Sequence, residues 1–319
     1  MISQPTISVV LPTFNCRPLM ARHLDCMEEW LDLAHEVIVV DSRSTDGTLE
    51  LIRRRLRHPN IRIIERDRGL YASWNEGIAA TSGKWIYVST AGDTISRDHL
   101  STMVERGECS QADVVISPSE YVDDSGRATP VARKKPWIYA EFASQGVVLI
   151  APPAVRHFAF RAAGTHALLG SCASDLFRGE FLRGRPFPQD YGTHGDTAWL
   201  LHHAYEMRLC VLQEAGSTFC LHVPTNAESK ESRAVVLDRI HSNEIAKGGM
   251  TPVLASSIRL RALMKQRKRA WRGWPTTLAW IAANLRYLKA RLSHRMLEAA
   301  ERRRLSGKIS KAFFRPLGA

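Results

Sequence analysis

The stretch that decides the fold is Lys84-Trp-Ile-Tyr-Val-Ser-Thr-Ala-Gly-Asp93, in which an apolar strand runs directly into Ala-Gly-Asp. Two earlier apolar runs end in the same manner, at Pro12-Thr-Phe-Asn15 and at Asp41-Ser-Arg-Ser-Thr-Asp-Gly47. Open α/β sheets bind their ligands at the carboxyl ends of the strands. Three expected strands therefore direct polar residues toward one edge of a sheet.

Strands and helices alternate along the first third of the chain. We expect strands at 7–11, 36–40, 61–64 and 85–89, and helices at 17–33, 49–56 and 70–80. This alternation predicts an α/β fold with a doubly wound, mainly parallel, Rossmann-like sheet. The later pattern is less regular, with a helix at 96–104, a strand at 112–117, a Gly- and Pro-rich stretch over 177–196, a helix at 197–205, and a strand pair at 209–212 and 218–221 that would complete a mixed sheet.

The basic character of the chain belongs to its C-terminal tail. The 319 residues are 45% hydrophobic and 24% charged, which is a globular composition, with a formal net charge of +12. From Arg259 onward seventeen Lys and Arg stand against two Glu, whereas residues 1–258 have 27 against 30 acidic residues. The composition therefore argues against nucleic-acid binding by the front domain. We expect one large domain over 1–255 and a basic helical tail over 256–319.

The tail has the pattern of a basic amphipathic helix. Apolar residues recur at helical spacing at Leu278, Ile281, Leu285, Leu288, Leu292 and Met296, flanked by Arg286, Lys289, Arg291 and Arg295. Trp271 and Trp274 lie among cations just before this stripe. The pattern predicts attachment to an anionic membrane surface. The alternative is a helix that packs on the large domain or pairs with a second subunit in a homodimer.

The cysteines and the N-terminus indicate a reducing compartment. None of the six cysteines forms a C-x-x-C pair, and no basic stretch followed by a long apolar core begins the chain. No run reaches the roughly 18–20 apolar residues needed to cross a bilayer. We therefore expect a cytoplasmic protein that is peripheral on the inner face of the membrane.

Four blocks of the sequence, taken in order and spacing, resemble the successive motifs of the inverting family 2 glycosyltransferases. They are Ser8–Asn15, Val39–Thr48, Asp67–Ile78 and Ser82–Asp93, and the resemblance extends over roughly residues 6–225. It implies a GT-A fold, a nucleotide-diphosphate sugar donor, hexosyltransferase activity and a divalent metal. The large domain would then be catalytic, with a donor half over about 1–110 and an acceptor half over about 111–255.

The resemblance assigns the donor site to the first three blocks and to Gly92. Pro12, Thr13, Phe14 and Asn15 would wrap the base, and Asp41 would accept the N3 hydrogen of uracil or a similar base, which favours a UDP-sugar. Asp67 and Asn75 would face the nucleotide, with Gly69 allowing close backbone approach. Two alternatives stay open: Asp41 as a cap of the following helix, a role that suits Asp46 better, and Asp67 as a solvated turn carboxylate.

The metal is expected at Asp93, because Mn²⁺ and Mg²⁺ prefer carboxylate oxygen and take water and phosphate as further ligands. The family's usual motif has two or three acidic positions here, whereas Thr90-Ala-Gly-Asp93 has one. His222, which follows the last expected strand, is a candidate second ligand. A structural role is the alternative for this single histidine.

The catalytic base is expected at Asp196. Inverting transfer needs a carboxylate to remove the proton of the acceptor hydroxyl, and Gly195-Asp-Thr-Ala-Trp199 matches the place where the family has its base. The alternative for Asp196 is an N-cap of the helix at 197–205. Asp190 is the second candidate for the base and Asp175 the third.

The predicted function is transfer of a sugar to a hydroxyl of a saccharide or lipid-linked acceptor in envelope polysaccharide synthesis. An inactive nucleotide-sugar-binding module is the first alternative, and it would not need a working base. A nucleic-acid-binding protein is the second, but it would leave the carboxylates at the strand ends unexplained.

Overall fold

The computed structural model describes residues 5–129, 137–162, 168–169, 172–221, 233–246, 285–293, 295–296, 299 and 314–316. The chain divides into two compact units, one of residues 1–240 with 315–319 and the other of residues 241–314. The domain boundary predicted at residue 255 lies outside the described residues.

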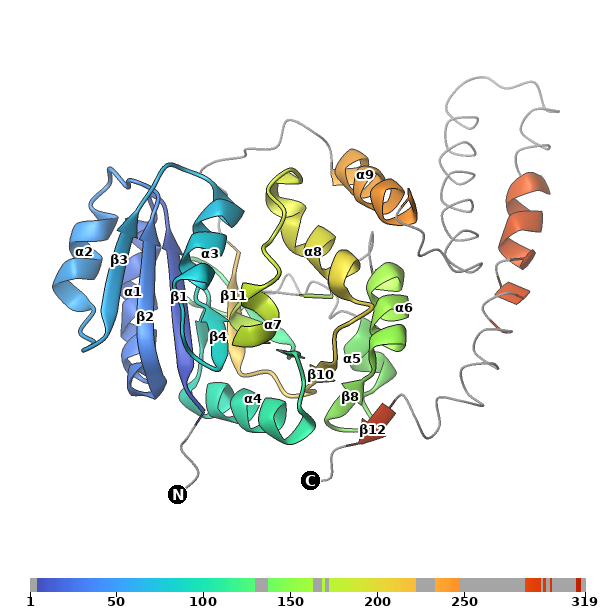
Figure 1. Cartoon of the computed structure of the whole chain (residues 1–319), viewed down its shortest axis with the longest axis horizontal. Helices are drawn as coiled ribbons and strands as arrows, with labels where there is room; N and C mark the ends of the chain where they lie inside the picture. Colours follow the sequence, from blue (N-terminus) through green and yellow to red (C-terminus); the bar gives the residue numbers. More distant parts are fainter. Residues whose placement is uncertain are drawn as a thin grey trace. The chain divides into compact units, whose positions relative to one another are not determined.

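A nine-stranded sheet forms the centre of the first unit, in the order β12-β8-β10-β6-β9-β4-β1-β2-β3 (Figure 1). The strands are β1 (Ile7–Thr13), β2 (Ala34–Asp41), β3 (Ile61–Glu65), β4 (Trp85–Val88), β6 (Val114–Ile116), β8 (Val148–Ile150), β9 (Asp175–Arg178), β10 (Leu209–Val211) and β12 (Phe314–Pro316). Strands β1 to β4 pair in parallel, whereas β9 runs antiparallel between β4 and β6, and β8 antiparallel to β10. The mainly parallel mixed sheet predicted from the sequence is confirmed.

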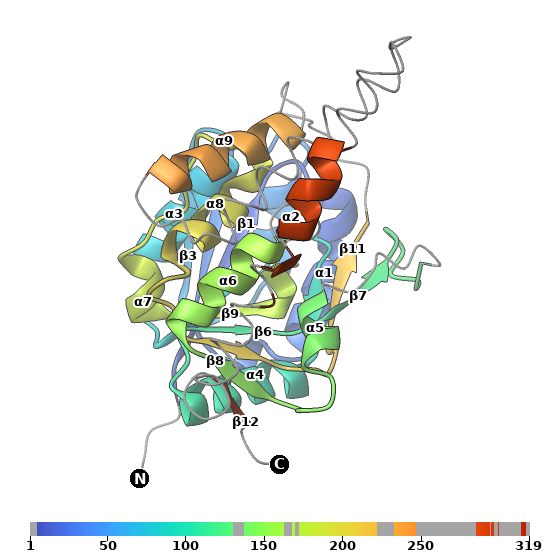
Figure 2. The ribbon, with the colours of Figure 1, turned by 90° about the vertical axis from the view of Figure 1, so that its right-hand side faces the viewer.

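Helices cover both faces of this sheet. Val9 and Val39 share a buried cluster with Met20 of α1 (Arg17–Glu28) and Leu100 of α4 (Arg97–Ser110). On the opposite face a Cβ added to Gly77 would lie 2.5 Å from Val10 Cγ1, so α3 (Leu70–Ala79) packs directly on the strands. Figure 2 shows α3, α7 (Gly179–Arg183) and α8 (Gly195–His203) on one side of the strands and α1 on the other.

Three sequence expectations need correction. The helix expected over 17–33 ends at Glu28, and a separate 3₁₀ turn follows at Leu31–Leu33. The expected final strand pair is divided, because β10 joins the main sheet whereas β11 (Ser217–Cys220) lies between β5 (Thr94–Ile95) and β7 (Ser119–Val122) in a second sheet. The Gly- and Pro-rich stretch expected over 177–196 begins inside a strand, β9. This strand has only four residues, which are too few to show a recognisable strand pattern in the sequence.

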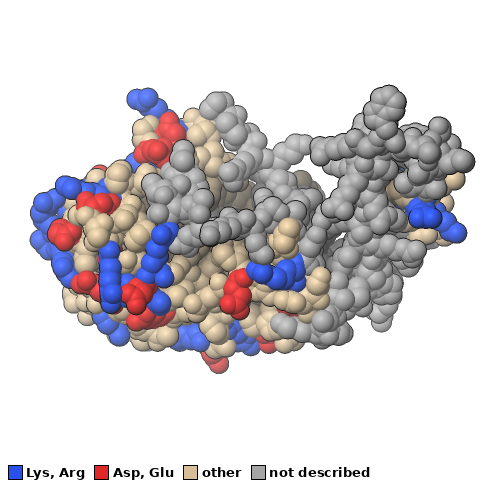
Figure 3. All heavy atoms as spheres, turned by 90° about the horizontal axis from the view of Figure 1, so that it is seen from above, with Lys and Arg blue, Asp and Glu red and all other residues tan. Residues whose placement is uncertain are grey.

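The remaining described elements complete the first unit and its border. They are α2 (Thr48–Arg55), α5 (Trp137–Glu141), α6 (Pro152–Ala162), α9 (Arg233–Ala246) and the 3₁₀ turns Cys172–Ser174 and Gly192–His194. On the face that Figure 3 shows, acidic and basic side chains of the described residues are interspersed. This mixture agrees with the near balance of charge in residues 1–258.

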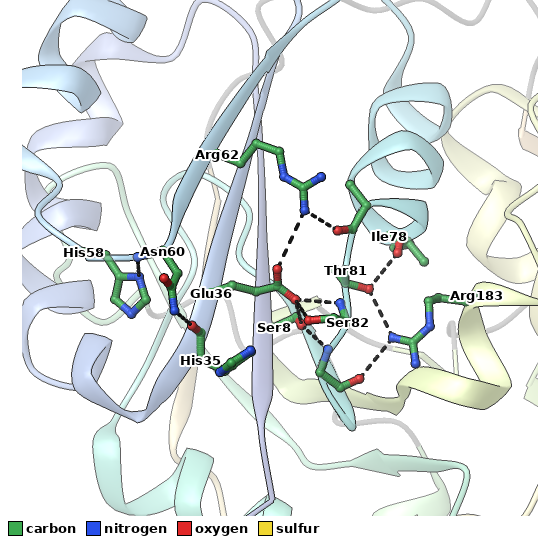
Figure 4. Close-up of polar contacts among 12 residues, drawn as sticks. Ser8, His35, Glu36, His58, Asn60, Arg62, Ile78, Thr81, Ser82 and Arg183 are labelled. Carbon is green, nitrogen blue, oxygen red and sulfur yellow. Dashed lines mark hydrogen bonds and ion pairs between the residues drawn. The ribbon is translucent and has the colours of Figure 1, made fainter.

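A buried glutamate ties three segments together at the amino edge of the sheet (Figure 4). Glu36 of β2 accepts hydrogen bonds on Oε1 from Ser8 Oγ at 2.6 Å and from the Ser82 N–H and Oγ at 2.6 and 2.8 Å. The Ser8 Oγ in turn accepts the N–H of Gly83 at 2.8 Å. The node therefore fixes β1 and β2 to the turn that precedes β4.

The described part of the tail is helical over 285–293 and 295–296, within the second unit. Four apolar side chains of the predicted stripe are exposed there, namely those of Leu285, Leu288, Leu292 and Met296. Leu278, Ile281, Trp271 and Trp274 lie outside the described residues. Among the helices that the structure describes, none combines the length and the hydropathy that a membrane span requires.

Candidate active site

The carboxyl edge of the main sheet gathers the residues that the sequence singled out. Strands β1, β2 and β4 are parallel, so the segments that follow Thr13, Asp41 and Val88 emerge at the same edge. Because β9 runs in the opposite direction, its first residue, Asp175, lies at this edge too, paired in register with Ile116. The edge therefore receives carboxylates from three strands of the described sheet.

Asp41 is held by the loop that follows β1 and by its own turn. Its Oδ1 accepts the hydroxyls of Thr13 at 2.8 Å and Ser44 at 2.7 Å, and its Oδ2 accepts the Ser44 N–H at 2.7 Å. Oδ2 has acceptor capacity left, but Asp41 is fully buried. The base contact predicted for Asp41 therefore stays a prediction, and it requires an adjacent side chain to move.

The alternative of Asp41 as a helix cap is wrong, because α2 begins at Thr48. Asp46 takes that part: its Oδ1 accepts the N–H of Thr48 at 3.0 Å, and its Oδ2 accepts the N–H of Arg17 at 3.0 Å. One carboxylate thus binds the first residues of two helices, α1 and α2. Gly47, with φ of 85°, is the N-cap residue itself.

The loop after β1 is ordered by short contacts. Asn15 adopts a left-handed conformation with φ of 45°, and its Oδ1 accepts the N–H of Thr45 at 2.8 Å. Pro12 lies within β1, opposite Val40. The guanidinium of Arg68 lies over the ring of Phe14, 4.6 Å from its centroid. One face of the Phe14 ring is therefore in contact with a cation.

Asp67 and Gly69 precede α3 at the same edge. The side chain of Asp67 is 80% exposed and pairs with Arg43 at 2.6 Å. Its placement matches the solvated turn carboxylate that the sequence left open, and a nucleotide role stays a prediction. A Cβ on Gly69 would come within 3.1 Å of Ala72 Cβ, so this helix start is closely packed.

The side chain of Asn75 joins α3 to the loop before α8. Its amide exchanges two hydrogen bonds with the backbone of Phe187, each of 2.8 Å: the N–H of Phe187 donates to Oδ1, and Nδ2 donates to the carbonyl. The donor contact expected of Asn75 stays a prediction, because both of its polar atoms also bind a loop 112 residues away in sequence. Asn75 fixes the segment before α8 to α3.

Asp93 lies at the turn after β4 and is 6% exposed. Its Oδ1 accepts the backbone N–H of Cys220 at 2.9 Å and its Oδ2 accepts the hydroxyl of Thr90 at 2.8 Å. Gly92 has φ of 93°, and its carbonyl accepts Arg22 Nη2 at 2.7 Å. The carboxylate is thereby oriented by a strand of the second sheet, which the sequence did not reveal.

Asp93 has the chemistry for a hard divalent cation but supplies few ligands. Among the described residues no three side chains of His, Cys, Asp or Glu meet as a metal cluster. The two oxygens of Asp93 accept hydrogen bonds from Thr90 and from the backbone of Cys220, which fix the orientation of the carboxylate. This suits a cation that takes most of its ligands from phosphate and water. His222, the predicted second ligand, lies outside the described residues.

Asp196 lies in the first turn of α8, which begins at Gly195, so it is not the N-cap that the alternative supposed; His194 is. Its Oδ1 accepts the N–H of Thr197 at 2.6 Å. Burial raises the pKa of the Asp196 carboxyl, and hydrogen bonds from Thr197 and from the hydroxyl of Tyr71 oppose that rise. A carboxylate with a raised pKa is a stronger base than an exposed aspartate.

Tyr71 of α3 supports Asp196 and was not identified from the sequence. Burial raises the pKa of its phenol well above the usual range, with the charge of Asp196 adding to the effect. The phenol therefore stays a hydrogen-bond donor, and its single proton is shared between Asp196 and the carbonyl of Thr193, which lies 3.2 Å from the hydroxyl oxygen. Residues 71 and 196 are far apart in the sequence, and no sequence pattern indicates their contact.

The other two candidates for the base have different surroundings. Asp190 is exposed, and its carbonyl accepts Arg239 Nη2 at 2.7 Å. Asp175 is 3% exposed. Burial, and then the charges of Asp175, Asp93 and Asp196, raise the pKa of the Cys172 thiol, so all three carboxylates act electrostatically on this side chain. The structure thus groups Asp175 with Asp93 and Asp196, and leaves Asp190 outside.

Comparison with known proteins finds similarity to glycosyltransferases over part of the chain. Residues 8–163 match the model of glycosyl transferase family 2. The succinoglycan biosynthesis protein ExoO of Rhizobium meliloti is 30% identical over 126 residues, which are 39% of this chain and 36% of ExoO. A PGL/p-HBAD biosynthesis glycosyltransferase of Mycobacterium bovis is 28% identical over 99 residues, 30% of this chain and 38% of that protein. The chain thus spans little more than a third of these relatives.

The fold is also similar to that of a solved structure. The crystal structure of residues 1–349 of TarS from S. aureus in complex with UDP-GlcNAc superposes with a TM-score of 0.59 at 17% identity, covering 89% of this chain and 81% of that one. The structure without a named ligand gives a TM-score of 0.55 at 18% identity, covering 89% and 80%. At this identity the likeness establishes the GT-A architecture.

Proposed function

We propose that this chain, a family 2 glycosyltransferase of GT-A fold, transfers a sugar with inversion from a nucleotide-diphosphate sugar, a UDP-sugar, to an acceptor hydroxyl. The observation that supports the proposal is that Asp93, at the turn after β4, and Asp196, in the first turn of α8, both act electrostatically on the Cys172 thiol. Asp93 suits the diphosphate end of the donor, and Asp196 suits the hydroxyl of the acceptor. The UDP-GlcNAc complex of TarS supports the choice of a uridine nucleotide.

Each residue has a chemical part in this proposal. Asp196 accepts the proton of the acceptor hydroxyl as its oxygen forms the new bond to the anomeric carbon of the sugar. The bond from that carbon to the phosphate oxygen breaks, and the nucleoside diphosphate leaves with the electron pair. Tyr71 and the Thr197 N–H keep the carboxylate of Asp196 in place. Direct displacement from the opposite side inverts the anomeric centre.

Asp93 would hold Mn²⁺ or Mg²⁺ together with oxygens of the donor diphosphate and water. The cation would neutralise the charge that develops on the departing diphosphate. The backbone N–H of Cys220 and the hydroxyl of Thr90 would keep the two oxygens of Asp93 oriented toward the cation.

The acceptor is proposed to be a saccharide or a lipid-linked saccharide of an envelope polysaccharide. The name of ExoO as a succinoglycan biosynthesis protein supports this class. The tail supports a membrane location, because exposed Leu288 and Leu292 share its helix with Lys289 and Arg291. Cations near an anionic surface contribute about 1 kcal/mol each. We therefore include peripheral attachment to the inner face of the membrane in the proposal.

The test is a donor screen that measures release of nucleoside diphosphate. Uridine, guanosine and thymidine diphosphate sugars are offered with and without Mn²⁺, to the wild type and to the Asp196→Asn variant. We expect release from a uridine donor, lost with a chelator and lowered by the substitution. Equal and unmeasurable turnover of both proteins, with donor still bound, would instead indicate an inactive binding module. Binding of duplex DNA but not of anionic liposomes would contradict the membrane part.

A further inference from the structure

Asp175 is a buried carboxyl group that the proposed reaction does not yet use. It is the first residue of β9 and is 3% exposed, and its Oδ1 has no hydrogen-bond partner among the described residues. A buried polar atom without a partner costs about 1–3 kcal/mol. A carboxylate oxygen can only accept hydrogen bonds, whereas a protonated carboxyl oxygen can donate one. If Asp175 is ionised, its unpartnered oxygen needs a hydrogen-bond donor. If Asp175 is protonated, the same oxygen can carry the proton and needs an acceptor.

The register of β9 shows which acceptor is at hand. Leu176 pairs with Tyr87 and belongs with it to the buried cluster on the α1 side of the sheet. Since side chains alternate along a strand, Asp175 and Phe177 point to the opposite side, where α8 lies. Phe177 confirms this, because its ring meets that of Trp199 in α8 edge to face, with 5.7 Å between centroids.

The same spacing brings Asp175 to Asp196. Asp175 precedes Phe177 by two strand residues, and Asp196 precedes Trp199 by three helix residues, so each carboxyl lies on the same face as its aromatic neighbour. The electrostatics agree: burial and then the charge of Asp196 raise the pKa of Asp175 well above its usual range. The two side chains thus face each other across the interface between β9 and α8.

Three other titratable groups feel the charge of Asp175, and their raised pKa values keep them neutral in this surrounding. They are Tyr87 of β4, Tyr139 of α5 and Cys172, and burial raises the pKa of each well above its usual range. In the described part of the chain, a hydrogen bond from Ser174 opposes the rise in the pKa of Asp175, and no cation lowers that pKa. Two carboxyls in one such pocket share a single proton more easily than they hold two charges.

We propose that the carboxyl group of Asp175 donates a hydrogen bond to the carboxylate of Asp196 and thereby orients the base of the transfer reaction. Asp175 is a positioning residue in this scheme, and the inference rests on the proposed function for its catalytic consequence. During transfer the acceptor proton moves to Asp196, and both carboxyls are then protonated. Loss of one proton to water restores the pair.

The first experiment measures protonation without activity. A carboxyl whose pKa is raised by folding costs stability once the pH exceeds its unfolded value, since the unfolded chain then binds fewer protons than the native one. Asparagine has nearly the same shape as aspartate but does not titrate, so Asp175→Asn removes this cost. The variant is expected to raise Tm by an amount that grows from about pH 4 to pH 8. In an Asp196→Asn background the gain should shrink, because the neighbouring charge is gone. The exposed Asp190→Asn is the matched control and should show neither effect.

The second experiment measures the consequence for the base. Asp175→Leu cannot donate, so the acid limb of the kcat profile should move to higher pH and kcat should fall by about tenfold or more. Asp175→Asn, whose amide can donate, should retain most of the wild-type kcat and an acid limb close to the wild-type pH. A lower Tm for Asp175→Asn at neutral pH, failure of that variant to fold, or an unchanged gain in the Asp196→Asn background would each overturn the proposal. If the wild type transfers no sugar, the proposed function fails, while the Tm series still decides the pairing.

Discussion

The ring of Tyr71 lies against the backbone of Gly195, so that a Cβ atom added to this glycine would come within 2.5 Å of both Cδ2 and Cε2 of the ring. The same atom would lie 2.5 Å from the carbonyl oxygen of Pro188. The space normally filled by a side chain at position 195 is thus taken by the tyrosine that supports Asp196. Because Gly195 has no side chain, Tyr71 can lie close to the neighbouring Asp196.

Gly195→Ala is expected to displace Tyr71 and to lower both stability and turnover. Overpacking a buried position costs about 1–3 kcal/mol, and the lost support of Asp196 should reduce kcat by about tenfold or more. Thermal unfolding and steady-state kinetics measure the two effects. Gly184→Ala is the control, because nothing lies within 4 Å of a Cβ there. Equal behaviour of the two variants would show that Tyr71 moves aside without consequence.

Asp196→Asn is expected to lower kcat by about 10²-fold or more, the usual effect of a general base, with little change in donor affinity. Since burial raises the pKa of Asp196, and the base acts only when ionised, kcat of the wild type should fall as pH drops through a value above 3.8. The variant should lack this acid limb. A matching loss of donor binding, measured by calorimetry, would assign Asp196 to the donor pocket instead.

Asp93→Asn and Asp93→Ala are both expected to abolish metal-dependent transfer, but they should differ in stability. Asparagine can still accept the N–H of Cys220, whereas alanine leaves this buried donor without a partner at a cost of about 1–3 kcal/mol. The Ala variant should therefore melt at a lower temperature. Full transfer by a folded Asp93→Ala protein in the presence of a chelator would refute the metal role.

Glu36→Gln is expected to destabilise the protein in a pH-dependent way. Burial opposes ionisation of Glu36, but hydrogen bonds from Ser8 and Ser82 outweigh it and lower the pKa below the ordinary 4.5. The ionised node should therefore contribute about 1.5–3 kcal/mol above that pH, and the contribution should disappear as pH falls through the folded pKa. Denaturant unfolding at several pH values tests this, with the exposed Glu50→Gln as control. A difference that persists in acid would exclude the ionised form as its source.

The membrane proposal predicts that Leu285→Gln, Leu288→Gln and Leu292→Gln together abolish sedimentation with anionic vesicles without changing donor turnover. These side chains are exposed in the described tail helix. Substitution is a cleaner change than truncation from residue 260, since truncation would also remove β12 from the main sheet. Wild-type binding should weaken with salt yet not vanish, because only its electrostatic part is screened. If the triple variant is insoluble, the stripe belongs to a protein core.

Local patterns in the sequence were sufficient for the donor half of the sheet. Strands β1, β2 and β4 are buried on both faces, so they appear as continuous apolar runs, and the polar turns after them follow at once in the chain. The direction of parallel strands then determines that Asp41 and Asp93 emerge at one edge. These conclusions need only burial and chain direction, which neighbouring residues encode.

Contacts between distant segments were decided by the tertiary structure alone. The sequence did not show that the amide of Asn75 binds the backbone of Phe187. The aspartates at 175, 190 and 196 had equal chemistry until folding buried the first, exposed the second and half-buried the third. β9 pairs with strands about 60–90 residues earlier, and its four residues have no pattern of their own. Residue types and local order follow from the sequence, but which carboxyl meets which depends on strand pairing and helix packing, because burial and charge coupling arise only between surfaces that folding brings together.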